Sequence, residues 1–161
     1  MDIDLRPVGP RDYGFLYRLL EEKTPEQNIS HRAMPTWEEH VAFNDAKPYA
    51  EDYVILLSDV PAGRVYITKG LNEVGIHIAR PFRRRGIARA VLKRLQAGGE
   101  TLHANIAPGN VHSQDLFTSM GFTLVQHTYR WEALTAPPEG GRVRLSPWRV
   151  PHADCRPSNR G

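Results

Sequence analysis

The residues best suited to chemistry form the run Arg83-Arg84-Arg85-Gly86-Ile87-Ala88. It follows the β-rich segment Val74–Ile78 and precedes an amphipathic segment. A helix that begins there presents backbone N–H groups without intrahelical partners, and its dipole adds positive charge. Gly86 lets the backbone approach a ligand closely, and Ala88 keeps the first helical turn thin. The arrangement predicts a phosphate-binding loop with arginines around it.

The loop pattern alone is weak evidence for phosphate binding, because an exposed basic helix start has the same pattern. A second segment downstream strengthens the interpretation. The segment contains Asn110-x-x-Ser113, then Leu116-Phe117, then Gly121-Phe122. Asn110 is a good N-cap and Gly121 a good helix end. With the loop and this segment, the chain resembles the GNAT (GCN5-related N-acetyltransferase) superfamily over roughly residues 3–131. Arg83-x-x-Gly86-x-Ala88 is similar to the acetyl-CoA loop of that family.

The resemblance implies acetyl-CoA as the donor and a set of residues that hold it. The strand before the loop would pair its backbone with pantetheine, the loop would hold the pyrophosphate, and the next helix would contact the pantetheine or phosphate end. The residues so implied are Ile76, His77, Ile78, Arg83, Arg84, Arg85, Gly86, Ile87, Ala88, Asn110, Ser113 and Phe117. In the family, two central parallel strands splay apart and the thioester enters the gap.

The implied reaction is direct attack of an amine on the thioester carbonyl, with much of the rate supplied by proximity in a ternary complex. A base must take a proton from the ammonium. Glu73, which begins the strand leading into the loop, is the candidate that some family members suggest, and a solvated carboxylate at a strand end is the alternative. Many relatives use a tyrosine as acid where this chain has Phe117, so another group serves here or no acid is needed.

The acceptor side of such an enzyme would lie in the segment of residues 28–43. It contains His31, Arg32, Trp37 and His40, which could form a polar pocket, and His31 could act as a base near neutral pH. A structural role is the alternative for each histidine. The segment is similar to one in GNAT enzymes that acetylate nucleotide-linked amino sugars and in phage-encoded GNAT proteins. The expected acceptor is a primary amine of a small molecule, an amino sugar or a modified base.

The periodicity predicts a mixed α/β fold of the order β-α-α-β-β-β-α-β-α-β-β, a mostly antiparallel sheet flanked by helices. A capping box at Thr36 and Glu39 starts a short helix through Phe43. A turn is expected at Pro61-Ala62-Gly63. The remaining predicted strands are Ile3–Val8, Tyr53–Leu57, Arg64–Thr68, Val74–Ile78, Thr101–Ile106, Phe122–Gln126 and Thr128–Ala133.

Composition sets the wider expectations. We expect a GNAT domain at 1–134 and a proline- and arginine-rich tail at 135–161. A single cysteine, no signal peptide and no long apolar run predict a cytoplasmic protein without a membrane partner. No metal motif is present. A net charge of +3 does not require nucleic acid as a partner. Homodimers are common in the family.

Three other functions stay open at the level of sequence. One is a CoA-binding regulator that has the fold but catalyses no turnover, an alternative that rests on Phe117 standing where many relatives have a tyrosine. Another is a protein or peptide N-acetyltransferase. The third is a nucleic-acid-binding module built on the arginines, which salt-dependent DNA binding would reveal.

Overall fold

The computed structural model describes residues 2–24 and 33–129. By its internal contacts the chain divides into two units, Met1–Leu124 and Val125–Gly161. Every helix and strand among the described residues belongs to the first unit, and the described part of the second, residues 125–129, is irregular. The predicted boundary at residues 134–135 lies outside the described residues and stays a prediction.

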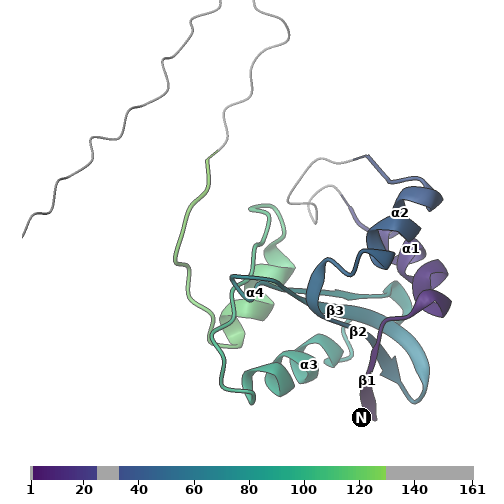
Figure 1. Cartoon of the computed structure of the whole chain (residues 1–161). Coiled ribbons are helices and arrows are strands. Elements are labelled where there is room, and N and C mark those ends of the chain that lie inside the picture. The colour runs from purple at the N-terminus through teal and green to yellow at the C-terminus, as the bar shows by residue number, and fades with distance from the viewer. Residues whose placement is uncertain (1, 25–32, 130–161) are drawn as a thin grey trace, which may run out of the picture. The chain divides into compact units, whose positions relative to one another are not determined.

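A four-stranded antiparallel sheet in the order β1-β2-β3-β4 forms the centre of the first unit (Figure 1). Its strands are β1 (Ile3–Pro7), β2 (Tyr49–Leu57), β3 (Val60–Thr68) and β4 (Val74–Ile78). The hairpin between β2 and β3 turns at Ser58 and Asp59, which both have positive φ, as a two-residue hairpin turn of type I′ requires. The turn predicted at Pro61-Ala62-Gly63 is therefore wrong, because these residues lie inside β3.

The helices are α1 (Tyr13–Glu21), α2 (Trp37–Asp45), α3 (Ile87–Gln96) and α4 (Val111–Ser119). The predicted capping box at α2 is confirmed: the Thr36 amide donates to Glu39 Oε2 at 2.8 Å and the Glu39 amide to Thr36 Oγ1 at 3.2 Å. Asn110 caps α4 as predicted, and Gly121, at φ +86, follows its end. Helices α3 and α4 lie on the other side of the sheet from α1 and α2 (Figure 1).

The main core lies between the sheet and helices α3 and α4. Alternation along the strands places one set of side chains on this face, and the 3.6-residue period of α3 turns its apolar stripe toward them. The buried members are Ile55, Ala62, Val65, Val74, Ile87, Val91, Leu92 and Phe117. A second, smaller group consists of Leu16 and Leu19 of α1 with Ala79. The mixed α/β fold class is thus confirmed.

The strands predicted after α3 are wrong in the described residues. In the stretch Thr101–Ile106 only His103 pairs, through an isolated parallel bridge to Glu73. The amide of Val74 donates to the His103 carbonyl at 2.8 Å, and the amide of His103 donates to the Asn72 carbonyl at 3.1 Å. Residues 122–129 are irregular, and the rest of the last predicted strand lies outside the described residues. The sequence favours β structure here, but within the described residues the bridge to Glu73 at the start of β4 is not continued into a ladder.

Candidate functional site

Backbone groups that lack partners mark the junction between β4 and α3. No amide from Arg84 through Arg89 donates a hydrogen bond within the described part of the chain, and the first bond of the helix is from the Ala90 amide to the Gly86 carbonyl. Arg84 and Gly86 have φ of +61° and +78°. Left-handed residues let successive N–H groups turn toward one point, and such a concave group of amides binds anions. The Arg84, Arg85 and Gly86 residues are exposed, so an anion can reach them.

The three arginines of the loop do different things. Arg83 is half-buried and bonds to other groups of the protein: its Nη2 lies 3.0 Å from Glu22 Oε2 and 3.1 Å from His77 Nε2, and its Nε donates to the Ile78 carbonyl at 2.8 Å. Arg85 places its guanidinium carbon 5.6 Å from the Phe82 ring centroid. Arg83 thus has structural contacts, and the predicted role of the three arginines as donors around a phosphate stays a prediction.

The edge of β4 that faces away from β3 is open beyond its first residue. The amide of Thr68 donates to the Glu73 carbonyl, and the amide of Ala79 donates to the Ala62 carbonyl. Every second residue of an antiparallel strand bonds to the same neighbouring strand, so Gly75 and His77, which lie between Glu73 and Ala79, also bond to β3. The N–H and C=O of Ile76 then point to the free edge. After the bridge at Glu73, no backbone bond joins β4 to residues 104–108 in the described chain. Where the family resemblance implied two splayed parallel strands, the described residues contain one strand, β4, and one parallel bridge from Glu73 to His103.

His77 was expected among the residues that pair with pantetheine, but its backbone faces β3 and its ring contacts Arg83. Burial, followed by the charges of Lys23 and Arg83, lowers the pKa of His77 to about 4. The imidazole is therefore neutral at physiological pH and accepts from the Arg83 guanidinium.

Glu73, the predicted base, lies at the point where the parallel segments separate. Its Oε1 accepts from Asn105 Nδ2 at 2.7 Å, and its amide donates to Thr68 Oγ1 at 3.0 Å. Its side chain shares a face of β4 with Gly75 and His77, opposite the face that packs on α3. The carboxylate is held in place and remains partly accessible.

The other predicted residues divide between α4 and the undescribed part of the chain. Asn110 Oδ1 accepts from the Ser113 amide at 3.2 Å, so this pair builds the start of α4. Phe117 is buried and meets Phe122 edge to face at 4.9 Å between ring centroids, which makes it a core residue. His31, the second predicted base, lies outside the described residues.

A polar cluster that the sequence did not predict lies on the face of the sheet under α1 and α2. Arg64 is buried and donates through Nε and Nη2 to the two carboxylate oxygens of Asp52 at 2.8 and 2.6 Å, and through Nη2 to Asn44 Oδ1 at 3.0 Å. Its guanidinium carbon lies 5.1 Å from the Tyr49 ring and 5.7 Å from that of Tyr66. Strand alternation places Arg64 and Tyr66 on one face of β3, and this pattern was the signal in the sequence that could have predicted the polar cluster.

His40 completes this polar face at α2. Its Nε2 lies 3.0 Å from the Tyr13 carbonyl, and Asn44 Nδ2 donates to the His40 carbonyl at 2.7 Å. Burial is the largest influence on the His40 pKa and lowers it. These contacts fit a structural role for His40, which was the alternative to a catalytic role.

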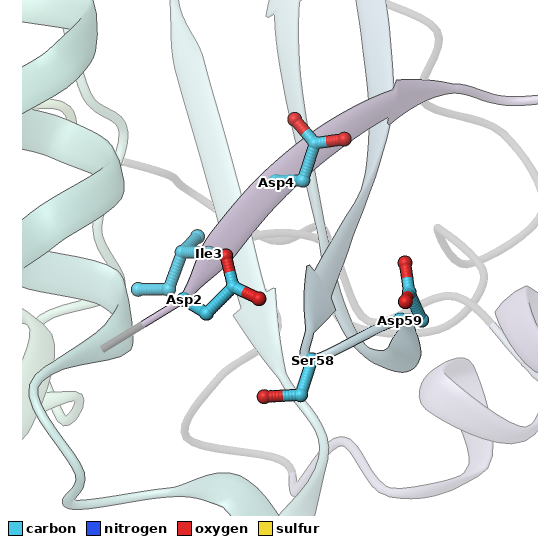
Figure 2. A pocket seen from close by; sticks show the side chains of 5 residues that line it. All are labelled: Asp2, Ile3, Asp4, Ser58 and Asp59. Carbon is cyan, nitrogen blue, oxygen red and sulfur yellow. The ribbon is translucent and has the colours of Figure 1, made fainter.

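A hollow elsewhere on the unit has the opposite charge. It is lined by Asp2, Ile3 and Asp4 at the start of β1 and by Ser58 and Asp59 at the β2–β3 turn (Figure 2). These carboxylates do not suit an anionic ligand. Within the described residues, no three His, Cys, Asp or Glu side chains are placed to hold a metal ion. Nor is any helix of that part long and apolar enough to cross a membrane.

Comparisons with known proteins agree with this geometry. Residues 71–131, which include β4, the loop and α4, match the model of the FR47-like protein family. An acetyltransferase from Thermus thermophilus superposes with a TM-score of 0.65 at 23% identity, covering 78% of this chain and 90% of that one. A putative acetyltransferase from Salmonella typhimurium, yncA, solved with acetyl-CoA, gives a TM-score of 0.61 at 18% identity over 77% and 81%.

A third structure is the aminoglycoside N-acetyltransferase AAC(6')-Iy with a CoA-linked bisubstrate analogue. It gives a TM-score of 0.61 at 16% identity and covers 83% of this chain and 99% of that one. No curated protein matches the sequence significantly. The fold is that of the acetyltransferases. The FR47-like match covers residues 71–131, and the solved structures share the fold of this chain.

Proposed function

We propose that the chain is an N-acetyltransferase that moves the acetyl group of acetyl-CoA to a primary amine of a small molecule. The observation that carries this proposal is the run of amides from Arg84 to Arg89 that donate no hydrogen bond in the described chain. Six successive donors around two left-handed residues, at a helix N-terminus, fit the pyrophosphate of CoA. The Arg84 and Arg85 side chains would add charge-assisted donors.

The adjacent edge of β4 fits the pantetheine arm. Ile76 offers one N–H and one C=O to an extended chain, and the amide groups of pantetheine complement them. Since Ile78 already accepts from Arg83 with its carbonyl, it contributes its N–H alone. His77 would act indirectly, by holding Arg83 and so the loop. Asn110 and Ser113 would position α4 beside the arm.

The reaction proposed at this site is direct attack by the amine nitrogen on the thioester carbonyl. Glu73 would accept the ammonium proton, directly or through water, with Asn105 holding one carboxylate oxygen. Binding both substrates together converts a bimolecular encounter into an intramolecular one. The candidate acceptor is an amino sugar or a modified base.

The test is CoA release from acetyl-CoA over a panel of amino sugars, polyamines, aminoglycosides and peptide N-termini. We expect release with at least one class of small amine. Glu73→Gln should lower kcat by about 100-fold or more with that amine at pH 7. Asp115→Asn, an exposed carboxylate on α4, is the matched control and should leave kcat unchanged. Unchanged activity in Glu73→Gln would remove Glu73 as the base.

A CoA-binding protein without turnover is the second candidate, and the burial of Phe117 favours it. This side chain is 5% exposed and has no hydroxyl to donate. Calorimetric binding of acetyl-CoA, combined with no CoA release across the whole panel, would establish the second candidate in place of the enzyme.

A further inference from the structure

The phenol of Tyr66 lies directly on β4, at the one residue that leaves room for it. Tyr66 on β3 is paired in register with Gly75 on β4. A Cβ built at Gly75 would overlap the Cζ and hydroxyl oxygen of the Tyr66 ring. The hydroxyl end of Tyr66 therefore crosses from its own strand and rests over the backbone of Gly75.

The ring of Tyr66 is fixed by its neighbours. It stacks on Tyr49 with 4.0 Å between ring centroids and 24° between planes. The Arg64 guanidinium lies beside both rings and is itself held by both oxygens of Asp52. Stacking and cation–π contacts of this kind restrict the ring to one orientation. The hydroxyl is thus aimed before any substrate arrives.

The position of this hydroxyl matters because of what surrounds it. Gly75 lies between Glu73, the proposed base, and Ile76, whose free backbone groups are the proposed pantetheine partners. Along the strand, Glu73 is about 7 Å from Gly75, at roughly 3.3 Å per residue. Burial is the largest influence on the pKa of Tyr66 and raises it, the Arg64 charge and a hydrogen bond with Tyr49 act in the opposite direction, and the charges of Asp52 and Glu73 add smaller upward influences. At neutral pH the phenol keeps its proton and can donate it.

We propose that Tyr66 is the catalytic proton donor to the leaving CoA thiolate, in place of any group on α4. This inference rests on the proposed acetyltransferase function. The amine nitrogen forms a bond to the carbonyl carbon, and the C–S bond then breaks with its electron pair on sulfur. The Tyr66 hydroxyl gives its proton to that sulfur. Glu73 first passes the ammonium proton to solvent water. The second proton, which the nitrogen loses on attack, goes to Glu73 and returns through water to the Tyr66 phenolate, so the products are the acetamide, CoA thiol and one proton in solution.

Tyr66→Phe tests the proposal, because it keeps the stacked ring and removes the hydroxyl alone. With the acceptor that gives CoA release in the panel, we expect kcat to fall about 100-fold or more and KM for acetyl-CoA to stay within twofold. Tyr53→Phe is the matched control. Tyr53 lies on the opposite face of the sheet, against the main core, and its loss of a hydroxyl should leave kcat unchanged.

A second readout separates proton donation from a structural role. Replacement of Tyr66 by a ring-fluorinated tyrosine lowers the phenol pKa and keeps the shape, so the alkaline limb of the kcat profile should move to lower pH. A kcat in Tyr66→Phe within twofold of the native value, or an unmoved alkaline limb, overturns the role of Tyr66 and leaves the acetyltransferase function standing. No CoA release by the native chain with any amine overturns both.

Discussion

Arg83 Nη2 lies 3.0 Å from Glu22 Oε2, which joins the first residue of the loop before α3 to the residue that follows α1. The same carboxylate oxygen accepts from the Arg80 amide at 2.8 Å. Side chains of both residues are largely shielded from water. The pair connects the proposed pyrophosphate loop to the point where the chain leaves for the proposed acceptor segment.

Glu22→Gln should therefore weaken donor binding as well as the fold. Loss of a partly buried, charge-assisted contact is expected to cost about 1–2 kcal/mol of unfolding free energy in urea. KM for acetyl-CoA should rise several-fold, because Arg83 is released from one of its three partners. Glu21→Gln, on the exposed neighbouring residue, should change neither quantity. Equal effects in the two variants would contradict the role of the pair.

The low pKa of His77 makes stability depend on pH in a definite direction. Burial and two neighbouring cations lower it to about 4, whereas the unfolded chain titrates near about 6.5. Between these values the unfolded state binds more protons, so stability is lost as the pH falls from 6.5 toward 4. By pH 5 the loss should be about 2 kcal/mol.

Urea unfolding at pH 7 and pH 5 measures this loss. His77→Gln, which keeps an acceptor for Arg83 and does not titrate, should lose about 2 kcal/mol less than the native chain over that interval. His112→Gln, on an exposed residue of α4, should behave as the native chain does. A native-like pH dependence in His77→Gln would mean that a group other than His77 causes the loss of stability.

The Arg64–Asp52 pair should be costly to break. Asp52→Asn leaves the buried Arg64 guanidinium without its counter-ion beside Tyr49 and Tyr66. The expected loss is about 3 kcal/mol of unfolding free energy. Thermal unfolding followed by circular dichroism gives the measurement, and Asp115→Asn is the exposed control. A loss under about 0.5 kcal/mol would show that water reaches the guanidinium.

Gly86→Ala tests the loop itself. Its φ of +78° is strained for an L-amino acid, so alanine should cost about 1–2 kcal/mol of stability. The amides would also lose their convergence, and the dissociation constant for acetyl-CoA should rise about tenfold or more. Gly14→Ala inside α1 has space for the methyl group and should stabilise the chain by about 0.5–1 kcal/mol. Unchanged acetyl-CoA affinity in Gly86→Ala would contradict the proposed site.

Gly75→Ala tests the close approach of Tyr66. The added methyl group must displace the phenol ring, and overpacking of this kind costs about 1–3 kcal/mol. Combining it with Tyr66→Ala removes the clash, so the two substitutions should not be additive. The double-mutant cycle from urea unfolding measures the coupling, which should be at least about 0.5 kcal/mol. Strict additivity would mean that the ring lies elsewhere.

Local patterns were sufficient for many elements. The capping box at Thr36, the cap at Asn110, the strand Val74–Ile78 and a helix that begins at the Arg83–Ala88 loop were all predicted, because each depends on neighbours within a few residues. Where β structure depended on a partner strand, prediction failed, as at Thr101–Ile106. The Pro61-Ala62-Gly63 turn failed because Ser58 and Asp59 adopt positive φ instead.

By itself, the sequence determined the loop, its place between a strand and a helix, and the resemblance that suggests CoA. Only the tertiary structure decided that Arg83 bonds to Glu22 and His77 while the Arg84–Arg89 amides donate no hydrogen bond in the described chain. It also placed Tyr66 on Gly75. The physical reason is range: caps and amphipathic stripes arise between residues a few positions apart, whereas strand register joins side chains that are distant in the chain.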